Sequence, residues 1–457
     1  MKIDFFAGKT VLVMGLGRFG GGIDAADFAS KLAREVIVTD KDDEAHLSGS
    51  VSRLAGRDNI KFHLGGHQEG DFAKADIVVV NPAVPEDNKF VKIAVEHGRF
   101  VTTAMNIFFE LCPADIVGIT GSNGKSTTTA LTYHLLKNAK GQAGFNYRNV
   151  YLSGNIGNEP LLALLDNVGP DDLVVLEISS FQSQLLANIN KAPRYSLVTN
   201  LTPNHLDRHG TFEAYCDAKE NLFRLQKCDA GKKAYSFFNA EDKVTMLWFE
   251  KYRKQTGRVC AAFDSNNVSV EMKKVYPLPG RANLSNLAAA SSVAKAAGVT
   301  DQNIINSLGS FKSLPHRLEL VAEKKGVRWY NDSISTTPQS SIVALEAFEE
   351  PKIIIAGGYD KKLPFNEFTE KIAKSAKAVV VIGNTADTIA KQVKQFENSS
   401  VIVKKASSLQ EAVNLCEQLA DSGDVVLLSP ACASYDMFIN FEDRGNQFAN
   451  LVRQLKD

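Results

Sequence analysis

The sequence predicts an α/β protein built from three domains with parallel sheets. Its 457 residues are too many for one ordinary core, and at about 150 residues per domain they predict three. Short β-branched runs recur along the chain, each followed by a glycine-rich or polar turn and then a helical pattern. This alternation is typical of parallel sheets with helices on both faces.

The expected strands fall into three clusters: residues 10–14, 36–39 and 77–80, then 116–119, 173–177 and 196–200, and finally 352–356, 378–382 and 425–428. We predict domain boundaries near residues 103 and 313, which give domains 1–103, 104–313 and 314–457. Residues 231–281 alternate less clearly, and we expect a short antiparallel or irregular excursion there.

The composition is that of an ordinary globular protein, with 44% hydrophobic and 23% charged residues. Its 52 Lys and Arg residues balance 52 Asp and Glu residues, which argues against nucleic acid as the main partner. The six cysteines are scattered without metal-ligand spacing, so we expect reduced thiols. With no signal-peptide pattern and no apolar run of about 20 residues, we expect a cytoplasmic protein without a membrane span. We also expect a monomer.

A glycine-rich turn follows the first expected strand, and residues 15–20 read GLGRFG. Asp40 ends the next strand, so the arrangement matches the dinucleotide fingerprint. By itself this segment favours an NAD-dependent oxidoreductase. The same turn accepts any pyrophosphate, or serves only as a tight connection, and Asp40 with Lys41 suits uridine or ribose as well as adenosine.

A second glycine-rich turn, residues 120–127 with the sequence TGSNGKST, opens the middle domain. Backbone N–H groups at a helix N-terminus attract anionic oxygens, Lys125 neutralises them, and the Ser126 hydroxyl can reach Mg²⁺. The common P-loop has four residues between its glycines, whereas Gly121 and Gly124 enclose only Ser122 and Asn123. The turn is either a chance match or a shortened phosphate cradle.

Polar residues follow the next strands of the middle domain. Glu177 ends a buried strand, where either a Mg²⁺ ligand or a salt bridge is expected. We predict His205 as a second metal ligand and His209 as an ordinary structural histidine. Lys219 lies in a helical stretch, and its residue type alone indicates a solvated helix lysine.

Three asparagines are further candidates. Asn155 is a turn residue by default. Asn283 and Asn286 are three residues apart and share one helix face. Helix capping is the structural interpretation of Asn283, and adenine recognition is the functional interpretation of the pair.

Taken together, these motifs resemble the Mur ligases, the ATP-dependent amino-acid-adding enzymes of peptidoglycan synthesis. The resemblance covers all three domains and rests on TGSNGKST at 120–127, EISS at 177–180, NHLD at 204–207, Asn283 with Asn286, HR at 316–317 and NDS at 331–333. Residues 428–448, LSPACASYDMFINFEDRGNQF, are similar to the branch of this family that adds D-glutamate. The shortened cradle is the form that this family uses.

The resemblance implies a Rossmann-like N-terminal domain for a UDP-muramoyl substrate, a central P-loop-type ATP-binding domain, and a Rossmann-like C-terminal domain for the amino acid. It implies that D-glutamate is added to UDP-N-acetylmuramoyl-L-alanine through an acyl phosphate, with ATP and one or two Mg²⁺ ions. Because the ligand sets lie on three domains, we expect domain closure on binding.

The resemblance also implies roles for individual residues. It places ATP at Gly121, Asn123, Gly124, Lys125, Ser126, Thr127, Asn283, Asn286, Arg317 and Asp332. It places the UDP-muramoyl substrate at Arg18, Phe19, Thr39, Asp40, Lys41, Asn155 and His205, and D-glutamate at Thr336, Lys361, Ser434 and Phe441. It places Mg²⁺ at Ser126, Glu177, His205 and a carbamylated Lys219, and it makes Lys125, His205 and Lys219 catalytic.

The chain departs from the family pattern at several positions. Ile334 stands where many members have lysine after NDS, residues 81–83 read NPA where SPG is more common, and Arg18 with Phe19 precedes three glycines. The alternatives are another ligase of this superfamily with a different amino acid, folylpolyglutamate synthase included, an NAD-dependent oxidoreductase, and a non-catalytic nucleotide-binding module. The oxidoreductase leaves the cradle, Glu177 and the C-terminal motif unexplained.

Overall fold

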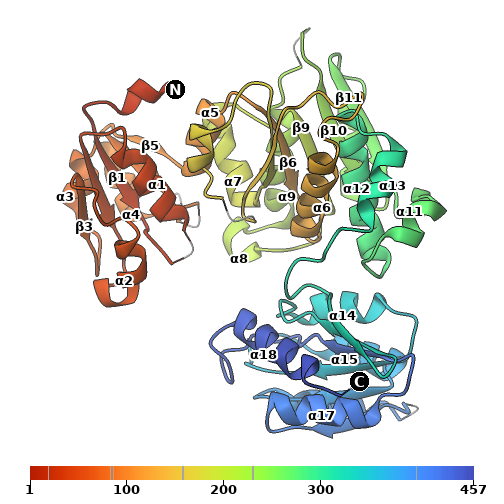
Figure 1. Ribbon diagram of the computed structural model, residues 1–457. Helices are drawn as coiled ribbons and strands as arrows, with labels where there is room; N and C mark the ends of the chain where they lie inside the picture. The colour runs from red at the N-terminus through yellow and green to blue at the C-terminus, as the bar shows by residue number, and fades with distance from the viewer. Residues whose placement is uncertain are drawn as a thin grey trace. The chain divides into compact units, whose positions relative to one another are not determined.

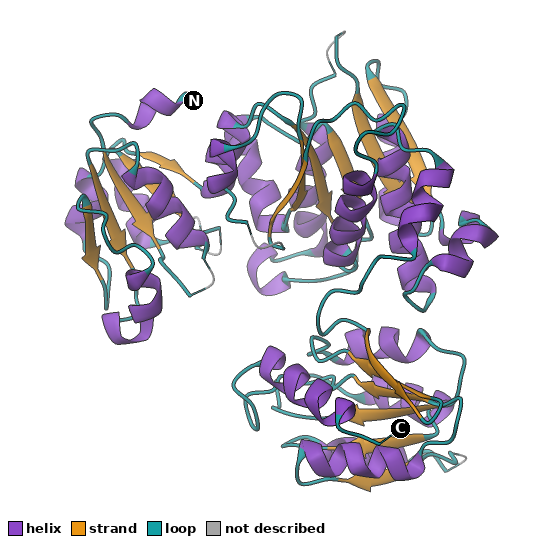
Figure 2. Cartoon of the chain, in the orientation of Figure 1, coloured by secondary structure: helices purple, strands orange, loops and turns teal. Residues whose placement is uncertain are grey.

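The structure is a computed structural model that describes residues 1–457 except Phe19, Ala83, Glu86, Gly157, Asn158, Asp229, Ala230, Asn398 and Asp457. The described residues form three sheets, each flanked by helices (Figures 1 and 2). Contacts divide the chain into two compact units, Met1–Asp264 with Ala288–Ile304 and Ser265–Leu287 with Ile305–Asp457. The α/β class with parallel sheets is confirmed, whereas the domain boundaries near residues 103 and 313 stay a prediction.

The N-terminal sheet has the strand order β3-β2-β1-β4-β5, and paired strands run parallel. Its strands are β1 (Thr10–Met14), β2 (Glu35–Thr39), β3 (Ile60–His63), β4 (Ile77–Val80) and β5 (Phe100–Thr102). Its helices are η1 (Ile3–Phe6), α1 (Gly21–Ser30), α2 (Glu44–Ser52), α3 (Glu69–Lys74) and α4 (Lys89–Glu96). Val11 and Val13 of β1 pack into one apolar core, and Leu12 and Met14 pack into another. Both faces of this sheet are therefore covered, as expected for buried parallel strands.

The central sheet has the order β11-β10-β9-β6-β8-β7, also with parallel pairs. Its strands are β6 (Asp115–Thr120), β7 (Val150–Gly154), β8 (Leu173–Glu177), β9 (Tyr195–Val198), β10 (Ala234–Asn239) and β11 (Arg258–Phe263). Its helices are α5 (Ala104–Leu111), α6 (Lys125–Asn138), η2 (Ala163–Asp166), α7 (Ser180–Leu185), η3 (Leu186–Ile189), α8 (Leu206–His209), α9 (Phe212–Arg224) and α10 (Lys243–Tyr252).

The expected antiparallel or irregular excursion within 231–281 was wrong. β10 and β11 extend the central sheet as parallel strands, with α10 between them. The physical reason is aromatic burial: Phe237 and Phe238 are at most 2% exposed, and the Phe238 ring packs 4.9 Å from that of Phe223 on α9. The helices η4 (Ser265–Asn267), α11 (Val270–Val275), α12 (Arg281–Ala296) and α13 (Asp301–Leu308) follow.

The C-terminal sheet has the order β12-β13-β17-β14-β15-β16, in which β12 is antiparallel to β13 and the other pairs are parallel. Its strands are β12 (Glu319–Lys324), β13 (Val327–Asn331), β14 (Lys352–Ala356), β15 (Ala378–Val381), β16 (Ile402–Lys405) and β17 (Val425–Leu428). Its helices are α14 (Pro338–Glu346), α15 (Asn366–Ser375), α16 (Ala386–Lys394), α17 (Leu409–Leu419) and α18 (Phe441–Arg453). Ile353 and Ile355 enter one core, whereas Ile354 enters the other.

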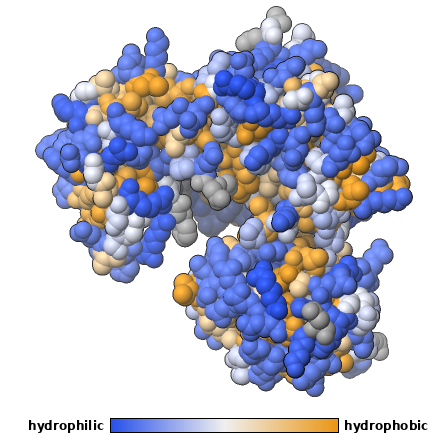
Figure 3. Space-filling view, in the orientation of Figure 1, coloured by the Kyte–Doolittle hydropathy of each residue, from blue (hydrophilic) through white to orange (hydrophobic). Residues whose placement is uncertain are grey.

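On the face seen in Figure 3, hydrophilic side chains cover most of the surface and apolar side chains appear in scattered patches. Within the described part of the chain, no helix is both long enough and apolar enough to span a membrane.

A close backbone contact inside the first strand–helix connection is testable. A Cβ on Gly22 would lie 2.1 Å from the carbonyl oxygen of Gly15, whereas a Cβ on Gly21 would meet no atom within 4 Å. We expect Gly22→Ala to lower the free energy of unfolding by about 1–3 kcal/mol, because backbone must move to admit the methyl group. Chemical denaturation measures the change, with Gly21→Ala as the matched control. Equal effects of the two substitutions would contradict the close contact.

Candidate functional site

A cavity opens at the carboxyl ends of β1 and β4, where the strand order of the N-terminal sheet changes direction. Ligands of open parallel sheets bind at such a switch point. The cavity has a volume of about 580 Å³. Its wall includes Gly20–Gly22 on one side and Asn155, Phe181 and His205 of the central sheet's loops on the other.

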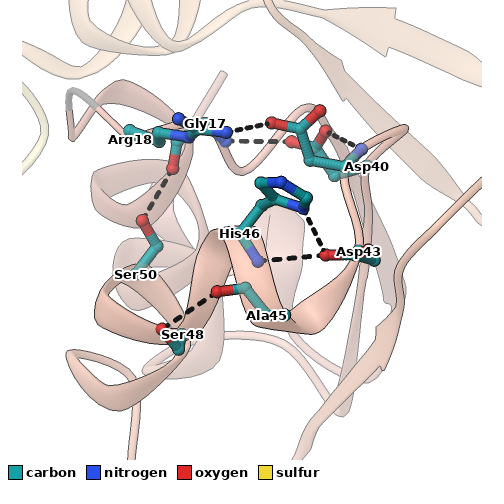
Figure 4. A network of polar contacts seen from close by, with 9 residues as sticks. Gly17, Arg18, Asp40, Asp43, Ala45, His46, Ser48 and Ser50 are labelled. Atoms are coloured by element: carbon teal, nitrogen blue, oxygen red, sulfur yellow. Dashed lines mark hydrogen bonds and ion pairs between the residues drawn. The ribbon is translucent and has the colours of Figure 1, made fainter. Parts of the chain in front are cut away.

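The glycine-rich turn after β1 is braced from within the protein (Figure 4). The Gly17 N–H donates to Oδ2 of Asp40 over 2.9 Å, and the Ser50 hydroxyl donates to the Gly17 carbonyl over 2.7 Å. Arg18 forms an ion pair of 3.1 Å with Asp42, and both side chains are about half exposed. In this structure Asp40 therefore stabilises the glycine-rich turn through the Gly17 N–H. In a dinucleotide site, the carboxylate at this position would bind a ribose hydroxyl instead.

The predicted UDP-substrate residues divide into two groups. Asn155 and His205 line the cavity. Thr39 lies at the end of β2, where its hydroxyl donates to the Gly66 carbonyl over 3.2 Å, and Lys41 is exposed. Arg18 and Asp40 lie with Thr39 and Lys41 on the β2 side of the turn, and Phe19 lies outside the described residues.

Asp24, which the sequence did not single out, fixes the two walls of this cavity to each other. Its carboxylate accepts hydrogen bonds from the backbone N–H groups of Leu162 and Ala163, over 2.8 and 3.2 Å. Burial raises the pKa of the Asp24 carboxyl, and these two backbone donors partly offset that rise. An isolated acidic residue in a helix carries no local sign of such a contact.

The phosphate-cradle turn lies between the end of β6 and the start of α6. Gly121 and Gly124 have φ angles of +140° and +80°, a region that glycine adopts without steric cost. A Cβ on Gly121 would lie 1.9 Å from Oγ1 of Thr199, so the turn lies directly against the segment that follows β9.

Side chains after β9 hold the same turn in place. The Thr199 hydroxyl donates to the Asn123 carbonyl over 2.6 Å, and the Asn123 N–H donates to Oδ1 of Asn200 over 2.9 Å. Lys125 begins α6, and its Nζ donates to the Ser122 carbonyl over 2.8 Å. The positive end of the helix and this ammonium group make the turn a site for anionic oxygens.

Lys219 lies inside the protein behind this cradle, not in solvent as its residue type indicated. It is 1% exposed, its Nζ donates to Oγ1 of Thr120 over 3.2 Å, and it lies 4.8 Å from the centre of the Tyr215 ring. Burial lowers the pKa of the Lys219 amine well below that of an ordinary lysine, Lys125 lowers it further, and Glu177 opposes the change. This environment favours the neutral amine over the ammonium form at Lys219.

Glu177, at the end of β8, supplies the carboxylate of the site. Its Oε2 atom is buried and has no hydrogen-bond partner among the described residues, which fits a bound cation. The described part of the chain contains no group of three His, Cys, Asp or Glu side chains spaced as metal ligands. The unpartnered oxygen of Glu177 near the phosphate cradle fits Mg²⁺, which binds through one or two carboxylates and takes further ligands from phosphates and water.

His205 has a left-handed backbone with φ of +52°, and its ring lies 5.3 Å from that of Phe181. Partial desolvation lowers the pKa of this imidazole, which favours the neutral ring. His209 stacks on Phe181 at 5.0 Å and contacts the Ser180 hydroxyl over 2.9 Å, as an ordinary structural histidine does.

The remaining predicted ATP residues belong to the second compact unit. The Asn286 amide donates to Oδ1 of Asn283 over 3.1 Å, so these two side chains do share one helix face. Asp332 follows β13 and accepts hydrogen bonds from the Ser429 hydroxyl, over 2.8 Å, and the Leu318 N–H, over 3.2 Å. Burial raises the pKa of the Asp332 carboxyl to about 6.

The predicted D-glutamate residues follow β13, β14 and β17, at the carboxyl edge of the C-terminal sheet. Nζ of Lys361 donates to Oγ1 of Thr336 over 3.3 Å. Ser434 is 2% exposed, and Phe441 begins α18, where its carbonyl accepts a hydrogen bond of 2.8 Å from Ser333.

Arg444 is a second residue whose role the sequence did not predict. Its guanidinium is fully buried and donates to the carbonyls of Ser333, over 2.8 Å, and Cys432, over 3.1 Å. Burial lowers the pKa of Arg444 to about 10. The side chain therefore joins the loop after β13 to the loop after β17. The only local signal was an arginine inside the 428–448 motif.

Comparison with known proteins decides the family. Residues 119–294 match the Mur ligase middle domain, and residues 316–432 match the Mur ligase glutamate ligase domain. A UDP-N-acetylmuramoylalanine–D-glutamate ligase from Acetivibrio thermocellus is 37% identical over 468 residues, covering 98% of this chain and 97% of that protein. The chain belongs to the Mur ligase family. The resemblance predicted from the motifs is confirmed.

Other relatives agree with this assignment. A UDP-N-acetylmuramoylalanine–D-glutamate ligase from Pelotomaculum thermopropionicum is 36% identical to this Mur ligase and covers 99% of both chains. The solved UDP-N-acetylmuramate–alanine ligase of Thermotoga maritima is similar with a TM-score of 0.59 at 18% identity, over 97% of this chain and 99% of that one. The MurF ligase of the same organism, solved with ADP, has a TM-score of 0.56 at 19% identity, over 98% and 96%. These two likenesses bear on the fold alone.

The raised pKa of Asp332 predicts a pH dependence of stability. Its carboxyl has a pKa of about 6 in the folded protein, against an ordinary value of 3.8. Between these values the unfolded chain releases the proton while the folded protein keeps it, so the contribution of Asp332 to stability falls as pH rises from about 4 to about 6. We expect Asp332→Asn to gain stability relative to the wild type across this range, by on the order of 2–3 kcal/mol.

The measurement is urea denaturation between pH 4 and 7, followed by fluorescence of Trp329 in a Trp248→Phe background. Trp329 lies on β13, three residues before Asp332, so the signal reports the second unit. Asp421→Asn, an exposed carboxyl of the same unit, is the matched control. If the stabilities of the wild type and of Asp332→Asn changed in parallel with pH, the raised pKa of Asp332 would be contradicted.

Proposed function

We propose that this Mur ligase uses ATP to join D-glutamate to the L-alanine carboxylate of UDP-N-acetylmuramoyl-L-alanine in peptidoglycan precursor synthesis. The observation that carries the proposal is similarity at 36–37% identity, over 98% or more of this chain, to ligases that bear the name of this reaction. The cradle, the buried Lys219 and the unpartnered oxygen of Glu177 supply chemistry that suits it.

The proposed reaction has two steps. The substrate carboxylate attacks the γ-phosphorus of ATP, the bond to the β-phosphate oxygen breaks, and an acyl phosphate and ADP form. The amine of D-glutamate then attacks the acyl carbon, and the tetrahedral intermediate loses phosphate as the nitrogen loses a proton. Lys125 and the N-terminus of α6 offset the charge that moves with the phosphoryl group, so the chain acts by positioning and electrostatic stabilisation.

The metal set is Ser126, Glu177, His205 and Lys219, the last as a carbamate formed when its neutral amine takes up CO₂. When bound, Mg²⁺ would neutralise phosphate charge. Carbamylation turns a buried amine into an anion, which places a charge opposite to that of the metal behind the cradle. The cavity at β1 and β4 receives the UDP-muramoyl substrate between the glycine turn and His205.

The amino-acid set is Thr336, Lys361, Ser434 and Phe441, in which a cation and hydroxyl groups suit a dicarboxylate. We propose the domains 1–103, 104–313 and 314–457 for the UDP-muramoyl substrate, for ATP with Mg²⁺, and for the amino acid. We also propose that the protein acts as a cytoplasmic monomer on small molecules, and that these domains close around them.

Phosphate release tests the proposed reaction. With Mg·ATP and UDP-N-acetylmuramoyl-L-alanine, we expect release to depend on D-glutamate, because only the intended amine completes the second step. L-glutamate and L-alanine are the controls. Release that is independent of D-glutamate, or that is equal with L-alanine, would reject this substrate assignment in favour of another ligase of the superfamily.

Lys219 offers a sharper test of the metal set. Lys219→Ala should lower turnover on the order of 100-fold or more, because a metal ligand is lost. High concentrations of formate or acetate should restore part of the activity by supplying the missing carboxylate. Lys243→Ala, an exposed lysine on α10, is the matched control. Near-normal turnover of Lys219→Ala, or a defect that neither acid relieves, would refute the carbamate.

A further inference from the structure

A second cavity lies at the opposite end of the central sheet from the phosphate cradle. It has a volume of about 340 Å³ and lies at the amino ends of β6 and β9. β6 begins at Asp115, which lines the cavity, and ends at Thr120, beside the cradle. At about 3.3 Å per residue, roughly 17 Å of strand separates the two places. The cavity therefore belongs to neither the ATP set nor the UDP-substrate set.

Positive charge dominates the described lining of this cavity. Lys191, Arg194, Lys227 and Lys232 face a single carboxylate, that of Asp115. Asp115 is already engaged, because it accepts a hydrogen bond of 2.8 Å from Tyr147 and forms ion pairs with Arg194 and, at 2.5 Å, with Lys232.

Carboxylates neutralise the two other lysines of the lining less completely. Lys191 lies 3.7 Å from Glu110, and Glu110 also pairs with the amino group of Met1. Lys227 is exposed and has no ion-pair or hydrogen-bond partner among the described residues. Lys191 therefore shares the Glu110 carboxylate with Met1 and also donates to the Phe109 carbonyl over 3.0 Å, whereas Lys227 has no carboxylate of its own among the described residues.

The deeper lining is apolar. Phe109 and Ile116 are 5% and 7% exposed, and Pro193 is buried between β9 and its neighbours. Lys227 and Lys232 are exposed, so the cations border an apolar interior. A volume of about 340 Å³ is at the small end of the range for ligand pockets, which suits one ring or a short chain.

We propose that this cavity binds a small organic anion, a carboxylate or phosphate on a single-ring or short apolar body. The anionic group would meet Lys191 and Lys227 in charge-assisted hydrogen bonds, and the apolar body would cover Phe109 and Ile116. A cation would be repelled by the lining. A neutral ligand would leave the excess positive charge of this lining without an opposing anion.

Phenyl phosphate is the probe, and calorimetry of the full chain measures its affinity. Saturating Mg·ADP and UDP are present, so that the two proposed nucleotide sites are occupied. The double variant Lys191→Gln/Lys227→Gln should bind the probe at least about tenfold more weakly than the wild type, because each lysine supplies one of the charged bonds. Lys92→Gln, an exposed lysine on α4, is the matched control and should bind as the wild type does.

Two further probes separate the parts of the proposal. Inorganic phosphate, which lacks the ring, and benzyl alcohol, which lacks the charge, should each bind more weakly than phenyl phosphate. No binding of phenyl phosphate at millimolar concentration, equal binding by the double variant, or equal binding of either simpler probe would overturn the proposal. The readout is binding and not turnover, so its failure is distinct from a failure of the proposed ligase reaction.

Discussion

The candidate site depends on the close approach of two backbone segments at the carboxyl edge of the central sheet. Gly121 leaves no room for a side chain against Thr199, and the Thr199 hydroxyl in turn holds the carbonyl of Asn123. This contact shapes the turn between β6 and α6, whose backbone amides and helix N-terminus are suited to bind an anion. The segment that begins at Thr199 also leads to His205, which lines the cavity at β1 and β4. One contact therefore relates the phosphate cradle to the wall of the neighbouring pocket.

Burial of charge is the second constraint, and it costs stability. An amine removed from water, as in Lys219, and a carboxylate oxygen without a partner, as in Glu177, are both unfavourable in an apolar interior. Buried polar groups of this kind collect at functional sites because a ligand or metal supplies the partner that the protein does not. Burial of a charged group is also unfavourable in the second unit, where it raises the pKa of the Asp332 carboxyl.

The two glycine-rich turns show how one local pattern serves different purposes. The turn at residues 15–20 matches the dinucleotide fingerprint, yet Asp40 accepts a hydrogen bond from that same turn. The turn at residues 120–127 departs from the common P-loop spacing, yet its two glycines have the left-handed backbone that a cradle requires. A glycine pattern indicates a turn and a nearby helix end, and the surrounding contacts decide what that turn can hold.

The sequence by itself determined the parallel α/β class, the bounds of β1, β4, β8, β14 and β17, and the two glycine turns, because buried β-branched runs and turn residues are local signals. It missed β10, whose strand character comes from aromatic packing against α9, and it indicated a solvated Lys219. Only the tertiary structure buried that amine, paired Asp24 with backbone far along the chain, and joined two loops through Arg444. Residue type and spacing describe one segment at a time, whereas burial depends on which faces of distant segments pack together.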